Sequence, residues 1–233
     1  MKIKFEVKDK IINIYSNKIE DNLPIVIYNS FDDDGIKLWD ECNKIDCNDF
    51  ILVNISNIKW NDEMTPWYCK SLFKGDTECN GKADEYIKLL ENNIIPEINK
   101  KLKSIEIQTK YYILAGYSLG GLFSIYSLFK TKLFSRIVSG SGSFWYPNII
   151  EYIKGNDFLN NPNKVYLSLG NKEKNTKNEV MSKVEENTLE LTNILKNRNI
   201  ETKFEFNQGG HFADSNLRIA KGLKWILEWK YFI

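Results

Sequence analysis

A serine, a histidine and a carboxylate carry the chemistry that this chain of 233 residues could perform. Ser118 lies at the centre of Gly116-Tyr-Ser-Leu-Gly120, and His211 is the only histidine in the sequence. The Gly-x-Ser-x-Gly pattern between a strand and a helix is that of a nucleophile elbow, in which the serine occupies a strained turn and its hydroxyl projects clear of the sheet. A serine hydroxyl needs a base to take its proton and an acid to orient that base. We therefore predict that Ser118 is a nucleophile and His211 its base.

The acid is expected between the serine and the histidine, because the chain order in this kind of site is Ser, then Asp or Glu, then His. Glu173 lies just past the predicted strand Val165–Leu169, where the acid belongs. Asp157 and Asp214 compete with it. Asp157 precedes that strand, and Asp214 is expected to cap the last helix. Glu173 is the favoured acid, with a solvated loop charge as the alternative interpretation.

An oxyanion hole would complete such a site with backbone N–H groups. One should come from Leu119, the residue after the nucleophile, at the start of the helix. The other should come from the loop that follows the apolar run Leu23–Tyr28, and therefore from Ser30 or Phe31. Because both would contribute only their backbone, residue type does not choose between them.

The stretch Tyr111–Phe129 has two interpretations, because no charged residue lies between Lys110 and Lys130. Its length is about that of a transmembrane helix, and Gly116-x-x-x-Gly120 is a helix-dimer spacing. The alternative is a buried strand, a tight turn and a buried helix. Three glycines and three serines favour the second interpretation, since paired glycines weaken the middle of a continuous helix.

Alternating strands and helices must position these residues. Strands are predicted at Lys2–Val7, Ile11–Tyr15, Leu23–Tyr28, Phe50–Ile55, Tyr111–Ala115, Ile137–Val138, Val165–Leu169 and Thr202–Phe206. Helices are predicted at Ile36–Asn43, Ala83–Leu102 with a kink or break at Pro96, Leu122–Phe129, Val180–Leu195 and Leu217–Trp229. The pattern indicates an α/β protein with a mostly parallel central sheet flanked by helices. With the elbow, it predicts a single α/β-hydrolase domain over residues 1–233, without a large lid domain.

Composition argues against several classes of partner. Lys plus Arg number 32 against 31 Asp plus Glu, so no global field attracts nucleic acid or an anionic membrane. Cys42, Cys47, Cys69 and Cys79 lack C-x-x-C spacing and stand with a single histidine, which predicts neither a zinc site nor another cofactor. The N-terminus has no apolar signal region, so we expect a cytoplasmic protein with reduced thiols.

Several short motifs together resemble a known family. They are the GYSLGG elbow, SGSFW at Ser141–Trp145, the GxxE loop ending at Glu173 and the Gly-Gly before His211. From roughly Leu23 to the C-terminus, the chain resembles the esterase branch of the α/β-hydrolases. That branch includes the ferric-siderophore (enterobactin and bacillibactin) esterases and the esterase D type. The resemblance implies a Ser-His-Glu triad with Ser118 as nucleophile, Glu173 as acid and His211 as base.

A further stretch, Glu63-Met-Thr-Pro66, narrows the resemblance to this branch. It matches the family's acidic-x-Thr-Pro stretch beside the pocket, which implies that Glu63 contributes to substrate binding, and Trp145 matches an aromatic residue that lines the pocket. Trp60 and Trp67 belong to the long irregular connection of residues 56–82, and connections of this length are usually functional. We expect both, together with Phe144 and Trp145, to form an apolar, aromatic pocket, with plain core positions as the alternative.

One departure from the family bears on the substrate. Siderophore esterases tend to carry an arginine shortly before the Glu63 stretch, whereas Lys59, Trp60 and Asn61 occupy that region here. A site with few arginines is a poor receptor for a strongly anionic ferric triscatecholate. The leading prediction is a serine carboxylesterase, similar to the siderophore esterases, that cleaves a small-molecule ester through an acyl-enzyme. The alternative is a catalytically inactive binding protein with the same fold.

Overall fold

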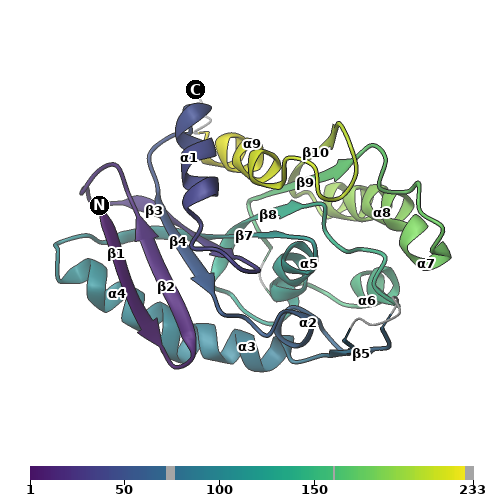
Figure 1. Ribbon diagram of the computed structural model, residues 1–233, viewed down its shortest axis with the longest axis horizontal. Helices are drawn as coiled ribbons and strands as arrows, with labels where there is room; N and C mark the ends of the chain where they lie inside the picture. Colours follow the sequence, from purple (N-terminus) through teal and green to yellow (C-terminus); the bar gives the residue numbers. More distant parts are fainter. Residues whose placement is uncertain (72–76, 160, 229–233) are drawn as a thin grey trace.

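A mostly parallel sheet runs through the centre of the molecule (Figure 1). The computed structural model describes residues 1–71, 77–159 and 161–228. Within them, an eight-stranded sheet has the order β1-β2-β4-β3-β7-β8-β9-β10. Its strands are β1 (Lys2–Val7), β2 (Lys10–Tyr15), β3 (Leu23–Asn29), β4 (Ile51–Ser56), β7 (Thr109–Tyr117), β8 (Phe134–Gly140), β9 (Lys164–Gly170) and β10 (Glu201–Asn207). The β1–β2 and β2–β4 pairs are antiparallel and the other pairs in this sheet are parallel, which confirms the predicted fold class.

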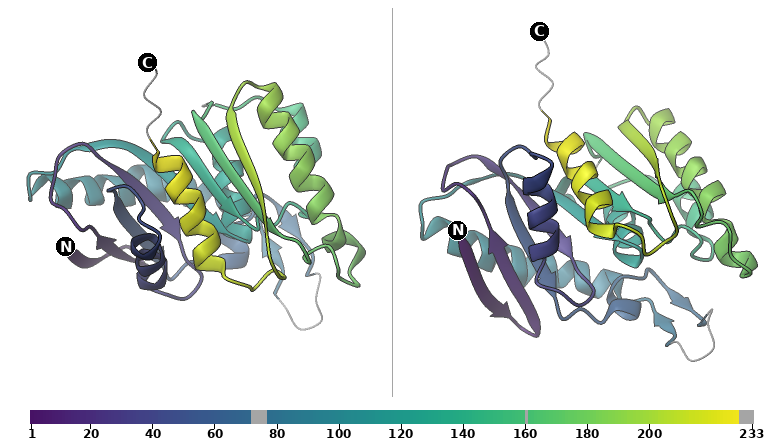
Figure 2. Two further views of the ribbon diagram at one scale, coloured as in Figure 1. Left: turned by 90° about the horizontal axis from the view of Figure 1, so that it is seen from above. Right: turned by 45° about the horizontal axis from the view of Figure 1, so that its top comes forward.

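Helices cover both faces of this sheet, as Figures 1 and 2 show. They are α1 (Ile36–Lys44), α2 (Trp60–Glu63), α3 (Ala83–Leu89), the π-helical η1 (Leu90–Ile94), α4 (Ile95–Lys103), α5 (Leu119–Tyr126), the 3₁₀ turn η2 (Ser127–Phe129), α6 (Ile149–Gly155), α7 (Glu179–Ser182), α8 (Val184–Asn197) and α9 (Ser215–Leu227). Val26 and Tyr28 of β3 pack in the layer with α1 and α9. Ile25 and Ile27 pack in the layer with α3, α5, α6 and α8. Because side chains on both faces of β3 are buried, the sequence of this strand is a continuous apolar run and does not alternate between apolar and polar residues.

Several predicted elements differ in extent from those observed; among them, the predicted helix Leu122–Phe129 begins earlier, as α5, and ends in the 3₁₀ turn η2. The predicted helix Ala83–Leu102 consists of α3, η1 and α4, and Pro96 lies in the first turn of α4, directly after the π-helical segment. The predicted helix Val180–Leu195 is two helices, α7 and α8, that meet at Lys183. Strand β8 is longer than the predicted Ile137–Val138. The prediction was too short because polar residues flank the two apolar ones and hide the strand pattern. The predicted end of the last helix at Trp229 lies outside the described residues.

The connection of residues 56–82 contains regular structure that was not predicted. It holds helix α2 and a short antiparallel hairpin formed by β5 (Tyr68–Cys69) and β6 (Cys79–Asn80). Residues 72–76 of this connection lie outside the described part of the chain. Two-residue strands leave too little sequence pattern to predict.

The carboxyl ends of the parallel strands meet at one edge of the sheet, which is where ligands bind in open α/β sheets. Ser118 follows β7, Glu173 follows β9, and His211 follows β10. Residues separated by up to 93 positions in the chain are thereby brought to one edge. No helix in the described ranges is long and apolar enough to cross a membrane, and Tyr111–Phe129 forms β7, α5 and η2 instead of a span.

Candidate active site

The turn between β7 and α5 has the conformation of a nucleophile elbow. Ser118 adopts φ 57° and ψ −122°, outside the regions that L-residues favour. A Cβ on Gly116 would lie 2.2 Å from the carbonyl oxygen of Gly120, so only glycine fits there. Gly121 is equally confined, since its Cβ would lie 2.7 Å from the Ser139 hydroxyl at the end of β8. The glycines of GYSLGG therefore allow the helix to start against the sheet.

Backbone hydrogen bonds hold the strained serine in place. The Ser118 N–H donates to Gly140 O at 3.0 Å. The Ser118 carbonyl accepts from the N–H groups of Leu122 and Ser143, each at 3.1 Å. In addition, the Ser143 hydroxyl lies 3.3 Å from the Ser118 hydroxyl. Ser143 was not singled out from the sequence, although it belongs to the SGSFW motif.

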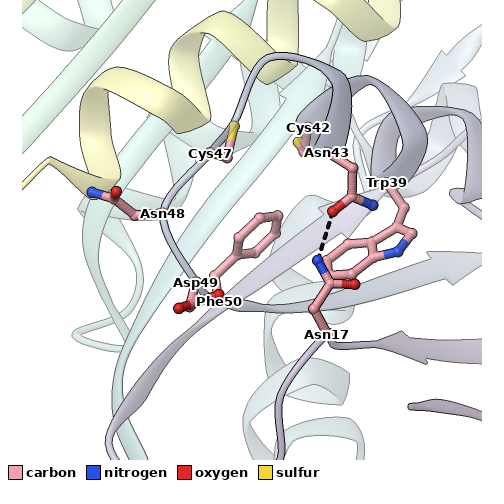
Figure 3. Close-up of a pocket in the computed structure, with 8 residues that line it drawn as sticks. All are labelled: Asn17, Trp39, Cys42, Asn43, Cys47, Asn48, Asp49 and Phe50. Carbon is pink, nitrogen blue, oxygen red and sulfur yellow. Dashed lines mark hydrogen bonds between the residues drawn. The ribbon is translucent and has the colours of Figure 1, made fainter.

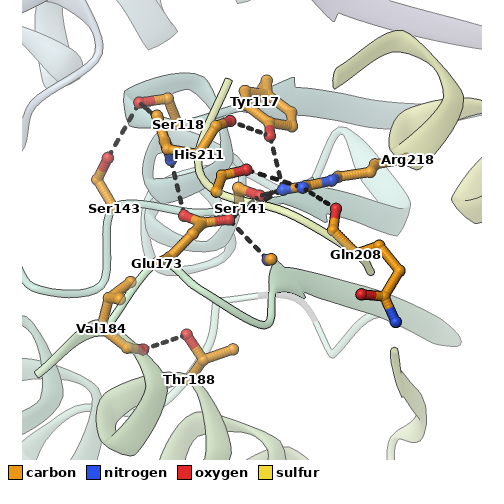
Figure 4. Close-up of polar contacts among 12 residues, drawn as sticks. Tyr117, Ser118, Ser141, Ser143, Glu173, Val184, Thr188, Gln208, His211 and Arg218 are labelled. Carbon is orange, nitrogen blue, oxygen red and sulfur yellow. Dashed lines mark hydrogen bonds and ion pairs between the residues drawn. The ribbon is translucent and has the colours of Figure 1, made fainter. Parts of the chain in front are cut away.

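Ser118, His211 and Glu173 form one continuous chain of hydrogen bonds (Figure 4). His211 Nε2 lies 3.0 Å from Ser118 Oγ, and His211 Nδ1 lies 2.7 Å from Glu173 Oε2. A carboxylate accepts only, so Nδ1 carries the hydrogen in the neutral imidazole and Nε2 is left to accept the serine proton. This arrangement can activate a hydroxyl for attack on a carbonyl carbon.

The two oxygens of the Glu173 carboxylate have different partners. Oε2 accepts from His211, whereas Oε1 accepts from the Gly170 N–H at 2.6 Å, the Ser141 hydroxyl at 2.7 Å and the Arg218 guanidinium at 2.9 Å. Burial raises the pKa of Glu173, but the hydrogen bonds from His211, Ser141 and Gly170 outweigh burial, and the pKa is lowered. Glu173 is therefore a buried, ionised carboxylate with a fixed orientation.

The competing carboxylate Asp214 does not have such contacts. It occupies the position before the first residue of α9, as predicted, but its backbone is left-handed (φ 51°) and its side chain makes no capping hydrogen bond, so the predicted side-chain cap is not formed.

Arg218 of α9 is the basic partner of Glu173 and is 1% exposed. Its guanidinium donates to Glu173, to the hydroxyls of Ser141 and Tyr117, and to two backbone carbonyls in the loop before His211. The Tyr117 hydroxyl in turn donates to the carbonyl of His211 at 2.6 Å. Arg218 thus connects the acid loop to the histidine loop (Figure 4). Sequence reasoning missed it, although an arginine on the apolar face of the last helix was an available signal.

A cavity of about 640 Å³ opens in front of Ser118 and His211. Of the predicted pocket residues, Trp60 and Trp145 line it, whereas Phe144 is fully buried in the core. Two exposed aromatic side chains stand at its edge, Phe31 at 64% and Phe212 at 93% exposure. The charged side chains among its described lining are Asp32, Asp33, Lys37 and Lys70, and no arginine is among them.

Trp60 links the elbow to the predicted oxyanion loop. A Cβ on Gly120 would lie 3.0 Å from the end of the Trp60 indole, so the glycine leaves room for this ring. Phe31 packs edge-on against the same indole, with ring centroids 5.5 Å apart. The Ser30 N–H donates to Ile55 O at 2.9 Å and is therefore engaged inside the sheet edge. Of the two expected oxyanion donors, this leaves Phe31.

Glu63 and Trp67, both predicted to bind substrate, are not among the cavity-lining residues. Glu63 pairs at 3.0 Å with Lys10, a fully buried lysine of β2, and accepts from the Lys59 N–H at the start of α2. Trp67 donates from its indole to Pro147 O and packs against neighbouring tyrosine rings. Both side chains thus contact neighbouring parts of the fold instead of the cavity.

The mostly parallel sheet, the helices on both faces and the elbow after a central strand define an α/β-hydrolase fold. Residues 38–216 match the protein family described as "Putative esterase". The chain therefore belongs to this esterase family, as its motifs predicted.

One curated protein and several solved structures are similar to this chain. "Uncharacterized protein YbbA" of Bacillus subtilis (strain 168) is 30% identical over 152 residues, which cover 64% of this chain and 60% of that relative. The match thus spans less than two thirds of the relative's length. An IroE-like serine hydrolase from Shewanella oneidensis has a TM-score of 0.77 at 17% identity, covering 97% of this chain and 80% of its own. The siderophore hydrolase EstA from Aspergillus nidulans has a TM-score of 0.72 at 16% identity, covering 97% and 93%. At these identities, both structures show a shared fold.

Proposed function

We propose that this protein is a serine carboxylesterase that works through an acyl-enzyme, with Ser118, His211 and Glu173 as its triad. The observation that carries the proposal is the hydrogen-bond chain from Ser118 Oγ through both nitrogens of His211 to Glu173 Oε2, facing a cavity. Membership of the esterase family supports the same reaction class.

In the first half of the reaction, Ser118 Oγ forms a bond to the ester carbonyl carbon while its proton passes to His211 Nε2. Glu173 stabilises the resulting imidazolium. The tetrahedral intermediate then collapses, the bond to the alcohol oxygen breaks, and His211 returns the proton to the leaving alcohol. In the second half, water repeats these steps on the acyl-enzyme, releasing the carboxylic acid and regenerating the Ser118 hydroxyl.

The oxyanion of each tetrahedral intermediate needs donors that are already oriented. We assign this role to the backbone N–H groups of Leu119, at the start of α5, and Phe31, in the loop after β3. The helix start adds the positive end of its dipole at the same place. The Ser143 hydroxyl, 3.3 Å from Ser118 Oγ, is suited to hold the nucleophile toward His211.

The cavity favours an ester without a large negative charge. Its two described aspartates, Asp32 and Asp33, balance its two lysines, Lys37 and Lys70, for a formal charge of zero (2 − 2). Aromatic side chains, including Trp60 and Trp145, supply apolar surface. Although a solved relative is a siderophore hydrolase, a strongly anionic ferric complex would find no guanidinium among the described lining residues. We propose an uncharged small-molecule ester with an apolar or aromatic group.

The test is hydrolysis of p-nitrophenyl acetate and butyrate by the purified protein. Ser118→Ala and His211→Ala should each lower kcat on the order of 10⁴–10⁶-fold, because residues of a triad act as a unit. A fluorophosphonate probe should label Ser118, as seen by mass spectrometry of the intact protein. Turnover that survives Ser118→Ala would refute the mechanism. Failure of the probe to label folded protein would favour the alternative, a catalytically inactive binding protein.

A further inference from the structure

The fold arranges the four cysteines as two neighbouring pairs, although the sequence has no C-x-x-C motif. All four are thiols in this structure. Cys42 and Cys47 lie at the end of α1, where the Cys47 N–H donates to the Cys42 carbonyl and Asp46 adopts φ 52°. This is the pattern of a helix end closed by a left-handed residue. Figure 3 shows these two residues beside a small cavity on the α9 side of the sheet.

The second pair, Cys69 and Cys79, lies directly across the β5–β6 hairpin. Side chains directly opposite each other on an antiparallel pair have Cβ atoms about 4.5–5.5 Å apart, and their Cα atoms lie about 4.5–5.5 Å apart. A disulfide needs Cα atoms about 4.4–6.8 Å apart. The pairing register therefore places the two Cα atoms at a separation that a disulfide spans, and forming the bond requires the Cβ atoms to approach to about 3.5–4.5 Å.

Both thiols also point to the same side of the hairpin. Cys69 is 7% exposed and Cys79 is 9% exposed, whereas their strand neighbours Tyr68 and Asn80 are exposed. Alternation of this kind means that the two sulfurs share the inner face. That inner face belongs to the cavity in front of Ser118, because both cysteines are among the residues that line it.

We propose that Cys69 and Cys79 are a modification site at which a low-molecular-weight disulfide converts the two thiols into a disulfide bond in the wall of the catalytic cavity. One protein thiol loses its proton, attacks the reagent disulfide and displaces a first thiolate. The second protein thiol then attacks the mixed disulfide and displaces the second thiolate. The protein loses two electrons and two protons, and the reagent is reduced to two thiols.

The position of the site sets two properties of this reaction. Burial raises the pKa of the Cys69 thiol, and its Sγ donates to Lys70 O at 3.3 Å. Exchange should therefore quicken with rising pH, by up to about tenfold per unit, because the thiolate is the reactive form. The disulfide bond would link β5 to β6 beside the cavity and could thereby change ester hydrolysis. That effect on hydrolysis rests on the proposed function, whereas formation of the bond does not.

The test uses the full-length reduced protein and oxidised glutathione. After incubation, remaining thiols are alkylated, and peptides are examined by mass spectrometry without reduction. We expect a cross-link between the peptides that contain Cys69 and Cys79, with loss of two hydrogen masses. In Cys69→Ser, Cys79 should instead end as a glutathione adduct or remain alkylated. In the matched variant Cys42→Ser, the Cys69–Cys79 cross-link should form at the wild-type rate.

Three results would overturn the proposal: cross-links confined to Cys42 and Cys47, separate glutathione adducts on Cys69 and Cys79, or complete alkylation of both at every pH tested. Ester hydrolysis is measured on the same samples. We expect at least a twofold change in kcat/KM on oxidation, reversed by dithiothreitol and absent in Cys69→Ser. If no sample hydrolyses esters, the proposed function fails, but the cross-link can still be read.

Discussion

Replacing Arg218 with methionine should destabilise the protein strongly, because it leaves the Glu173 carboxylate buried without its cation. The Arg218 side chain is 1% exposed and the Glu173 side chain is 4% exposed. Removing one partner of such a buried pair costs about 3–5 kcal/mol, a large share of the roughly 5–15 kcal/mol that stabilises a typical domain. At about 2–4 °C per kcal/mol for a domain of this size, Tm should fall by about 6–20 °C.

A double-mutant cycle measured by thermal and urea unfolding tests this reasoning. Glu173→Gln should also destabilise, because it leaves the Arg218 charge uncompensated. Arg218→Met combined with Glu173→Gln should lose less stability than the sum of the two single losses, since neither charge is then stranded. The matched control is Lys100→Ala, which breaks the exposed 3.6 Å pair with Glu97 and should cost less than about 1 kcal/mol.

Two outcomes would refute the argument. One is a Tm for Arg218→Met that is as close to wild type as that of Lys100→Ala. The other is simple additivity in the cycle, which would show that Arg218 and Glu173 do not depend on each other. If Arg218→Met is too unstable to purify, Arg218→Lys keeps the charge, loses the planar fork and should give a smaller shift in the same direction.

Three further predictions concern the elbow and its surroundings. Gly116→Ala should cost about 3 kcal/mol or more in unfolding experiments, because its Cβ would meet the Gly120 carbonyl at 2.2 Å. Gly155→Ala, where no atom lies within 4 Å, should be neutral or slightly stabilising, and equal losses would contradict the steric account. Ser143→Ala should lower kcat/KM for p-nitrophenyl butyrate by about two- to twelvefold, the value of one hydrogen bond, with Tm little changed; an unchanged kcat/KM would count against its contact with Ser118. Finally, because the folded pKa of Glu173 lies below its ordinary value of 4.5, its stabilising contribution should be complete above that pH and disappear as pH falls through the folded pKa. The unfolding free energy should therefore rise with pH between about pH 3 and 7, the range of carboxyl titration. In Glu173→Gln, part of this pH dependence should be lost, and a pH dependence identical to that of the wild type would contradict the prediction.

The triad candidates could be predicted because each depended on local pattern or on elimination. Ser118 lies in a motif whose glycines are those that the tight turn of a nucleophile elbow requires, and His211 is the only histidine in the sequence. Glu173 followed from the order of strands, since the carboxyl ends of parallel strands share an edge. Contacts between distant segments were harder. Arg218 reaches Glu173 because α9 packs along β8 and β9, and the position of an arginine on the apolar face of α9 does not by itself identify its partner.

The substrate-binding residues show the same limit. Trp60 and Trp145 line the cavity, but Glu63 is paired with Lys10, a residue of β2 that lies 53 positions earlier in the chain (63 − 10). A match to a family motif placed Glu63 near the pocket and could not reveal which way its side chain turns. Likewise, α2 and the β5–β6 hairpin are too short for periodicity to predict, since tertiary packing decides such elements.

The position of the Trp60 indole limits how the cavity can be enlarged by substitution. The end of the indole lies beside Gly120, where a Cβ would come within 3.0 Å of it, and the Phe31 ring packs edge-on against the same indole. A smaller residue at this position would enlarge the space for substrate, but it would also remove the support under the proposed oxyanion donor. If Phe31 is the oxyanion donor proposed above, one ring therefore couples the selectivity of the enzyme to its rate. Variants in which a smaller residue replaces Trp60 to admit bulkier esters should turn over every ester more slowly, unless a second substitution restores a packing contact for Phe31.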